Sequence, residues 1–364
     1  MKILLAGGGS GGPVTPILAV ILEIKKLEPR TQFLFVGTKR GPESIMVTDA
    51  GFKFISIPAA KWRRYFSIKN LFEPFIFVAG FIRAWFIIKQ FKPDVVFAAG
   101  SFVSVPICWA AKIKKVKIVI HQQDARVGLA NRLIAPVADQ ITTAFEQTSK
   151  QFYSGSGMDP NNLKPAAEWV GNPVRPDLLI KNNSAKFFFH LHESLPILLI
   201  LGGATGSAQI NQLLSEILPD LVKAHQVIHQ TGKGKNIINF KHENYHAIEL
   251  IPFREYASIL QMAHLVVARA GLSTIAELSA LGKAAIIIPM PKTHQEENAK
   301  ILASLYAAIV LTGTDATSDN LNRIINKLKF DLKFTEALGE NISAIIPTDA
   351  ARRLAEIIIK THAQ

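Results

Sequence analysis

Two glycine-rich segments, each directly after a short apolar run, divide this chain of 364 residues into similar halves. The first, GGGSGG at 7–12, follows the run 2–6, and the second, GGATGS at 202–207, follows the run 197–201. Each pattern predicts a strand, a tight turn and a helix start, because glycine permits sharp turns and the close approach of a ligand. The N–H groups at such a helix start favour an anion. The repeat therefore predicts two nucleotide-fold domains that face each other across a cleft.

Runs rich in Val, Ile and Phe alternate with longer helical patterns along both halves, which is typical of parallel α/β architecture. Strands are expected at 2–6, 33–36, 53–57, 95–98, 117–120 and 140–143, and at 197–201, 226–229, 246–250, 265–268, 284–288 and 308–311. Helices are expected at 14–27, 72–90, 104–113, 207–223, 255–262, 273–281, 295–306 and 318–328. Continuously apolar strands suit a sheet with helices on both faces. The predicted fold class is α/β, with two Rossmann-like domains built on parallel sheets.

Gly, Pro, Asn and Ser accumulate between residues 154 and 185, which predicts a linker there. The tail 349–361 is expected to be a helix, and its isoleucines imply that it docks back onto the first domain. We therefore expect an N-terminal domain at 1–174, completed by 350–364, and a C-terminal domain at 175–349.

Composition narrows the classes of protein. The single cysteine, Cys108, excludes a disulfide within the chain and a thiolate metal cluster, which favours a reducing compartment. The N-terminus lacks a signal-peptide layout, and no run of about 18 uncharged apolar residues predicts a membrane span. The formal net charge of +13 favours an anionic partner. Because the lysines are scattered and no nucleic-acid-binding motif is present, we expect that partner to be an anionic membrane face or a phosphorylated substrate.

The two glycine loops differ in what they are suited to bind. The first matches the dinucleotide pattern G-x-G-x-x-G, which needs an acidic residue at the end of the second strand. Residues 35–39 offer none, which argues against an NAD-dependent oxidoreductase. The second loop is the better phosphate candidate, because Thr205 and Ser207 add hydroxyl donors. The alternative for the first loop is a tight turn without a ligand, and for the second loop it is simple packing of a strand against a helix.

Polar segments follow three further predicted strands. RAGLSTIAE at 269–277 ends in Glu277, whose carboxylate suits vicinal ribose hydroxyls, although a helix-dipole partner is the plainer interpretation. PMPKTHQEEN at 289–298 offers amide and imidazole groups for sugar hydroxyls, although a histidine such as His294 is commonly a surface residue. HQQD at 121–124 is expected either to face the cleft or to cap the next helix.

The stretch 61–89 combines basic and aromatic residues with a strongly apolar helical pattern. A helix that is apolar nearly all round is usually buried in a core. A basic rim beside exposed aromatic side chains would instead suit an interfacial membrane contact. For that second interpretation the candidate residues are Trp62, Arg63, Arg64, Phe75, Phe81 and Trp85.

Taken together and in order, the motifs resemble the MurG family of bacterial glycosyltransferases. The resemblance covers nearly the whole chain, in the segments GGSGGPVTPILA at 8–19, PDVV at 93–96, AGSFVSVP at 99–106, HQQD at 121–124, GLANR at 128–132, GNPVR at 171–175, HQTGK at 229–233, RAGLSTIAE at 269–277 and HQEENA at 294–299. It implies the two-domain GT-B fold, with the C-terminal helix returning to the N-terminal domain. It also implies an inverting, metal-independent transfer of GlcNAc from UDP-GlcNAc, a substrate and not a cofactor.

The resemblance further implies the lipid-linked acceptor undecaprenyl-diphospho-MurNAc-pentapeptide, at the cytoplasmic face of the plasma membrane, in peptidoglycan synthesis. The donor-binding residues that it implies are Arg175, Ala204, Thr205, Gly206, Ser207, Arg269, Gly271, Thr274, Glu277, His294, Gln295 and Asn298. The acceptor diphosphate would lie at Ser10, Gly11, Gly12, Gly100, Ser101 and Ser104.

This chain departs from the family pattern at the residues that would carry acid–base chemistry. Pro13 stands where the family has a histidine, and proline carries no proton. Gln122 and Asp124 stand for a glutamate and an asparagine, and Ala204 stands for a serine. Asp124 or His121 is the expected replacement base. The departures leave two alternatives open: a related transferase with another lipid acceptor, and a catalytically silent protein that binds sugar nucleotide.

Overall fold

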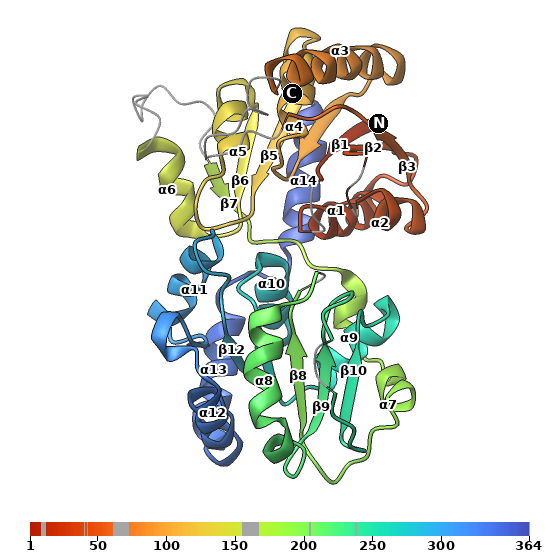
Figure 1. The fold of residues 1–364 in the computed structure, drawn as a ribbon. Helices are drawn as coiled ribbons and strands as arrows, with labels where there is room; N and C mark the ends of the chain where they lie inside the picture. The colour runs from red at the N-terminus through yellow and green to blue at the C-terminus, as the bar shows by residue number, and fades with distance from the viewer. Residues whose placement is uncertain are drawn as a thin grey trace. The chain divides into compact units, whose positions relative to one another are not determined.

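The computed structural model describes residues 1–8, 12–39, 41, 43–60, 73–154, 167–203, 205–236 and 239–363. The chain divides into two compact units. Unit 1 comprises Met1–Arg175 and Thr348–Gln364, and unit 2 comprises Pro176–Pro347 (Figure 1).

Unit 1 is built on a seven-stranded sheet in the order β3-β2-β1-β4-β5-β6-β7, in which every pair is parallel. The strands are β1 (Lys2–Ala6), β2 (Gln32–Gly37), β3 (Lys53–Ser56), β4 (Val95–Ala98), β5 (Lys117–Gln122), β6 (Gln140–Thr143) and β7 (Ala167–Trp169). The helices are α1 (Val14–Leu27), α2 (Glu43–Asp49), α3 (Glu73–Phe91), α4 (Ser104–Ile113), α5 (Leu129–Ile134) and α6 (Glu146–Ser154). The strand order reverses between β1 and β4, which is where ligands bind in open parallel sheets.

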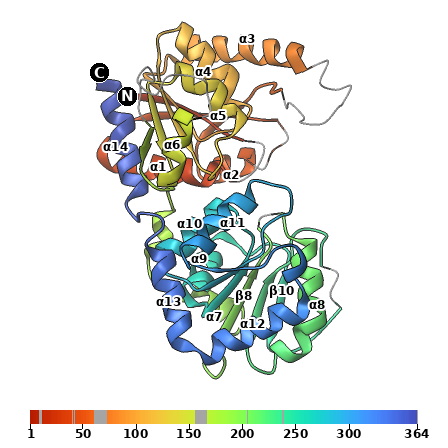
Figure 2. The same cartoon turned by 90° about the vertical axis from the view of Figure 1, so that its left-hand side faces the viewer.

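The sheet of unit 1 buries an apolar layer on each face. One layer joins the strands to α3 and α4 through residues such as Ile88 and Cys108, and Figure 2 shows these two helices packed along each other. The other layer joins the strands to α1 and to the C-terminal helix α14 (Ala350–Ala363), through Ile21 and Leu354. The expected return of the last helix to the first unit is thereby confirmed.

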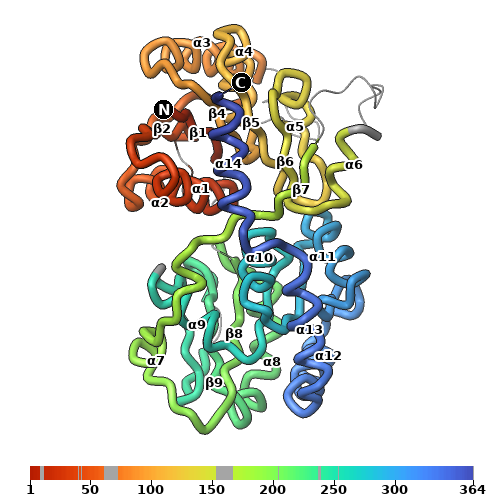
Figure 3. Tube along the Cα trace, turned by 180° about the vertical axis from the view of Figure 1, so that it is seen from behind, coloured from red at the N-terminus to blue at the C-terminus, as the bar shows by residue number. Residues whose placement is uncertain are grey.

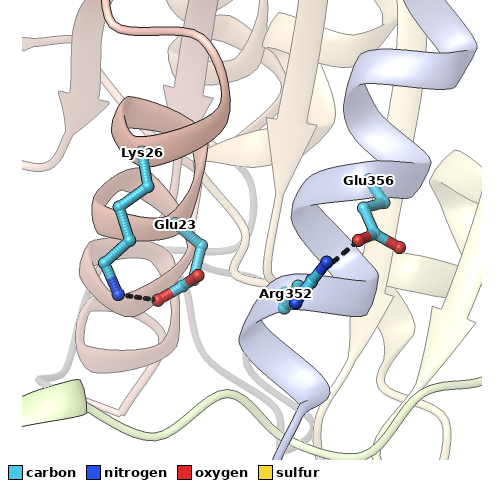
Figure 4. Close-up of polar contacts among 4 residues, drawn as sticks. All are labelled: Glu23, Lys26, Arg352 and Glu356. Atoms are coloured by element: carbon cyan, nitrogen blue, oxygen red, sulfur yellow. Dashed lines mark hydrogen bonds and ion pairs between the residues drawn. The ribbon is translucent and has the colours of Figure 1, made fainter.

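Helix α14 lies beside α1 and crosses β4 and β5 (Figure 3). The buried side chains of α14 point into the core, while its exposed side pairs Arg352 with Glu356 at 2.9 Å (Figure 4). On α1, Lys26 pairs with Glu23, also within one helix (Figure 4). Such exposed pairs contribute little, so burial of the apolar side is what holds α14 on unit 1.

Unit 2 is built on a six-stranded sheet in the order β10-β9-β8-β11-β12-β13, again parallel throughout. The strands are β8 (Ile197–Leu201), β9 (Gln226–Gln230), β10 (Tyr245–Ile248), β11 (Leu265–Ala268), β12 (Ala285–Ile287) and β13 (Ile309–Val310). The helices are α7 (Ser184–Phe188), α8 (Ala208–Leu221), α9 (Phe253–Met262), α10 (Leu272–Leu281), α11 (Gln295–Ser304), α12 (Ser318–Phe330) and α13 (Leu332–Ser343). Here the strand order reverses between β8 and β11.

The predicted α/β class and both parallel sheets are confirmed. The linker predicted at 154–185 is wrong in part, because β7 pairs with β6 inside it and α7 begins at its end. A three-residue edge strand is too short to show a period in the sequence. Helices α2, α5, α6 and α13 were also not predicted, and three of them have ten residues or fewer.

Candidate functional site

In unit 2 the second glycine loop lies at the carboxyl end of β8, where the strand order reverses. Gly206 has φ +70°, and a Cβ there would lie 2.2 Å from the carbonyl oxygen of Thr231, so only glycine fits. Ser207 caps α8, since its Oγ accepts a 3.1 Å hydrogen bond from the N–H of Ile210. Thr205 is exposed, and Ala204 lies outside the described residues. The loop thus presents a helix N-terminus and a hydroxyl at a ligand-binding edge.

A buried network holds the loop after β9 against this glycine loop. The Lys235 amine donates to the carbonyl of Gly206 at 3.2 Å, and the Gln230 amide donates to the carbonyl of Gly203 at 3.1 Å. Asn211 donates to the carbonyl of Lys235 at 2.8 Å and is hydrogen-bonded to the ring of His229. Burial lowers the pKa of His229 to about 4, so the ring is neutral at pH 7. The motif HQTGK at 229–233 gives no indication of these contacts.

Arg269 lies directly after β11, the strand beside β8. Its Nε and Nη1 are buried and have no hydrogen-bond partner among the described residues. Desolvation lowers the pKa of the guanidinium, which records the cost of burying this charge. Arg269 as a whole is half-buried, but burying two donors of a cation without a partner is costly unless an anion is bound. An anionic ligand at the β8–β11 edge would supply the missing hydrogen-bond partner of these two nitrogens.

Glu277 and Thr274 lie in α10, which begins after Gly271. Glu277 is 7% exposed, and its Oε2 accepts a 2.6 Å hydrogen bond from the phenol of Tyr256 on α9. Tyr256 was missed by the sequence analysis, since no local pattern links two residues 21 positions apart.

The segment after β12 carries the candidate residues His294, Gln295 and Asn298. Asn298 is fully buried, and its amide donates to the carbonyl of Ala270 at 3.1 Å, so it holds the loop beside Arg269. Gln295 is half-buried, and its Oε1 accepts from the N–H of Met290 at 3.0 Å. His294 is exposed. Asn298 therefore supports the site through the backbone of Ala270.

In unit 1 the end of β1 lies beside the loop after β4, where the strand order reverses. The hydroxyl of Ser104 hydrogen-bonds to the carbonyl of Gly100 at 2.9 Å and lies 3.2 Å from that of Ala6. Gly100 has φ +79°, and Ser101 has φ +94°, a backbone conformation that is rare outside glycine and concentrates at functional sites. Gly12 is half-buried, and Ser10 and Gly11 lie outside the described residues.

The loop after β5 carries both candidate bases. Strand β5 extends to Gln122, two residues beyond the predicted end, so His121 is a strand residue and is fully buried. Its ring hydrogen-bonds to Thr142 at 3.0 Å, and burial lowers its pKa to about 4, against a smaller opposing effect of Asn172. The ring of His121 therefore lies in the interior of unit 1, within β5 and not in the loop that follows it. Asp124, beyond the strand, is half-buried.

The remaining expected site residues lie at the boundary between the units and on α3. Arg175 is 7% exposed and is the last residue before unit 2 begins. On α3, Phe75 is exposed, whereas Phe81 and Trp85 are half-buried and contact each other. Trp62, Arg63 and Arg64 lie outside the described residues.

Helix α3 has both a buried side and an exposed apolar side. One side packs on the core through Gly80, Ala84 and Ile88, and the other exposes the apolar side chains Phe75, Ile76, Val78, Ile82 and Phe86. In the described part of the chain, α3 alone is long and apolar enough to span a membrane, judged by length and composition only.

No cluster of three or more His, Cys, Asp or Glu side chains suited to a metal ion occurs in the described ranges.

Residues 3–143 match the N-terminal domain of glycosyltransferase family 28, and residues 197–353 match its C-terminal domain. Together with the two Rossmann-like units, these matches define a two-domain glycosyltransferase. A relative from Listeria welshimeri is 33% identical, over 99% of both chains, and one from Pediococcus pentosaceus is 32% identical, over 98% of this chain and 99% of its own. Both are named UDP-N-acetylglucosamine–N-acetylmuramyl-(pentapeptide) pyrophosphoryl-undecaprenol N-acetylglucosamine transferase. The chain belongs to this transferase family.

Solved structures agree with this assignment. The crystal structure of MurG from Acinetobacter baumannii has a TM-score of 0.72 and 25% identity to this chain, with 99% of each chain covered. The UDP-GlcNAc 2-epimerase from Neisseria meningitidis, solved with UDP-GlcNAc, has a TM-score of 0.71 at 16% identity, which is a likeness of fold.

Proposed function

We propose that this chain transfers GlcNAc from UDP-GlcNAc to undecaprenyl-diphospho-MurNAc-pentapeptide, the lipid-linked precursor of peptidoglycan. The names of its full-length relatives support the reaction. The observation in the structure that carries it is Arg269, whose buried Nε and Nη1 have no hydrogen-bond partner among the described residues. They lie at the β8–β11 edge, three residues before the first residue of the helix that holds Glu277. That edge offers a cation for a diphosphate and a carboxylate for a ribose.

In the proposed donor complex, the diphosphate binds the helix N-terminus after 202–207 and the cations Arg269 and Arg175. The ribose hydroxyls donate to Glu277, and Gln295 contacts the sugar. The charge that develops on the departing UDP is stabilised by these fixed donors. UDP-GlcNAc is a substrate, so the proposed reaction uses no cofactor.

The acceptor diphosphate is proposed to bind the loops after β1 and β4; Ser104 links the second of these loops to the end of β1. The acceptor hydroxyl attacks the anomeric carbon as the bond from that carbon to the UDP oxygen breaks, which inverts the configuration. Asp124 takes the hydroxyl proton. We assign this role to Asp124 because the alternative, His121, is fully buried.

We propose that the enzyme acts at the cytoplasmic face of the plasma membrane and binds it peripherally. The exposed side of α3 presents Phe75, Val78 and Phe86 to solvent, at 74, 54 and 57% exposure. Because α3 also contributes Gly80 and Ala84 to the buried packing of unit 1, it would rest on the lipid surface instead of leaving the unit. The net charge of +13 favours an anionic surface.

The proposal is tested by measuring UDP release from UDP-GlcNAc with a lipid-linked MurNAc-pentapeptide acceptor, beside calorimetric titration with UDP-GlcNAc. We expect binding of the donor and release of UDP that depends on the acceptor. Donor binding without release would indicate a silent protein or another acceptor. Absence of donor binding at millimolar UDP-GlcNAc would refute the proposed function.

A further inference from the structure

The side chains of Tyr256 and Glu277 join two helices of unit 2. The Tyr256 hydroxyl donates to Glu277 Oε2 at 2.6 Å, which is the short distance typical of a hydrogen bond to a charged acceptor. Glu277 is 7% exposed, so water does little to orient its carboxylate. A protein donor therefore fixes where this carboxylate points.

We propose that Tyr256 is a positioning residue that makes the site select nucleotides with an intact ribose over deoxyribonucleotides. This inference rests on the proposed function, in which Glu277 accepts hydrogen bonds from the ribose hydroxyls. Each carboxylate oxygen can accept two hydrogen bonds. Oε2 is thus able to hold the phenol and a ribose hydroxyl together.

Selectivity follows from the orientation of the carboxylate. A glutamate has three side-chain torsions, and fixing them during ligand binding costs conformational entropy. The hydrogen bond from Tyr256 fixes most of these torsions before the ligand binds. Two vicinal hydroxyls can then bond to two carboxylate oxygens that are already correctly oriented. A deoxyribose leaves one of these buried acceptor positions unused, which weakens its binding.

The surrounding structure also fixes Glu277 from the backbone side. Glu277 lies in α10, and the loop before α10 is held by Asn298, whose amide donates to the carbonyl of Ala270. Tyr256 lies on α9, which packs against α7 and β8. The phenol therefore approaches the carboxylate from an element that is itself anchored in unit 2.

The test uses Tyr256→Phe, which removes one hydroxyl and keeps the ring. UDP and 2′-deoxy-UDP are titrated into the wild type and the variant, and KM and kcat are measured with UDP-GlcNAc. We expect UDP affinity to fall about tenfold, with the kinetic effect mainly on KM, because a charge-assisted hydrogen bond is lost. The preference for UDP over 2′-deoxy-UDP should shrink by a similar factor. Tyr306→Phe is the matched control, because Tyr306 is 78% exposed in the same unit.

A double-mutant cycle with Glu277→Gln separates the possible outcomes. Coupling between the two substitutions supports the proposal, because Tyr256 then acts through Glu277. Wild-type binding of UDP with an unchanged nucleotide preference in Tyr256→Phe overturns the proposal and leaves the proposed function standing. Tight UDP binding by Glu277→Gln overturns the ribose role on which the proposal rests. No UDP binding by the wild type overturns both. Melting temperatures of all variants report whether each is folded.

Discussion

The amide of Asn131 donates a hydrogen bond of 2.8 Å to Oε1 of Gln122, and both side chains are buried. The Gln122 amide in turn donates to the carbonyls of Asp124 and Arg126, at 2.9 and 3.1 Å. Gln122 thus shapes the loop that carries Asp124. In the family pattern that this chain resembles, the acid stands at the position of Gln122 and an amide at that of Asp124, so the two groups are exchanged here.

Gln122→Glu should disrupt this loop. The new carboxylate would face the two carbonyl oxygens that accept from the Gln122 amide. Losing this amide donor and burying a charge would together cost about 2–3 kcal/mol. We expect a lower melting temperature and at least tenfold lower turnover near pH 7.5. Thermal denaturation and UDP release measure the two effects. Gln123→Glu, at the half-buried neighbouring position, is the control. Wild-type stability of Gln122→Glu would contradict the assigned role.

Asp124→Asn tests the proposed base. The substitution keeps the size of the side chain and removes its ability to take a proton. General-base catalysis contributes roughly 10²–10⁴ in rate, so turnover should fall by that range while UDP-GlcNAc affinity stays at the wild-type value. Single-turnover kinetics and calorimetry provide the two readouts. Unchanged turnover would remove Asp124 from the mechanism.

Arg269→Gln separates binding from stability. Because the buried guanidinium nitrogens have no partner among the described residues, their removal should leave the unliganded melting temperature unchanged or raise it. UDP affinity should fall about tenfold or more, since a charge-assisted contact is worth roughly 1.5–3 kcal/mol. Arg323→Gln, on the exposed side of α12, is the control. Equal stabilisation of Arg269→Gln and wild type by UDP would count against a diphosphate at Arg269.

The buried histidines make stability depend on pH. The pKa of His229 is lowered from 6.5 to about 4. Between pH 4 and pH 6.5, the unfolded chain therefore binds a proton at this residue that the folded chain does not bind. Stability should be full above about pH 6.5 and should decrease as the pH falls toward 4, by up to about 3 kcal/mol from this residue. His229→Gln should flatten the curve of melting temperature against pH in that window. An identical curve would exclude His229 as a source.

The exposed side of α3 should control membrane binding. Phe75→Ser combined with Phe86→Ser removes two large apolar side chains from solvent and leaves the buried side of α3 intact. We expect at least tenfold weaker sedimentation with vesicles that contain anionic lipid, since burying each ring is worth about 1.5–3 kcal/mol. Phe330→Ser is the control, because Phe330 is 79% exposed in unit 2. Equal loss with the control would show that the effect is not specific to α3.

The sequence predicted the elements that local patterns define, but not the contacts between residues far apart in the chain. The apolar runs before the glycine loops predict β1 and β8 at their observed bounds, because buried parallel strands are continuously apolar. Strand β7 was not predicted, because three residues are too few to show a strand pattern and only the pairing with β6 identifies it as a strand. His121 was misplaced because β5 continues two residues further than its apolar run. The Tyr256–Glu277 and Asn131–Gln122 contacts join separate elements, and no local pattern predicts such pairs.

The central claim is that the carboxyl edge of the unit 2 sheet binds the UDP of the donor. A crystal structure of the protein with UDP tests this most directly. We predict ribose hydroxyls within hydrogen-bond distance of Glu277, and a diphosphate at the N-terminus of α8 beside Arg269. A nucleotide bound instead at the first glycine loop of unit 1, with Glu277 and Arg269 unoccupied, would contradict the account.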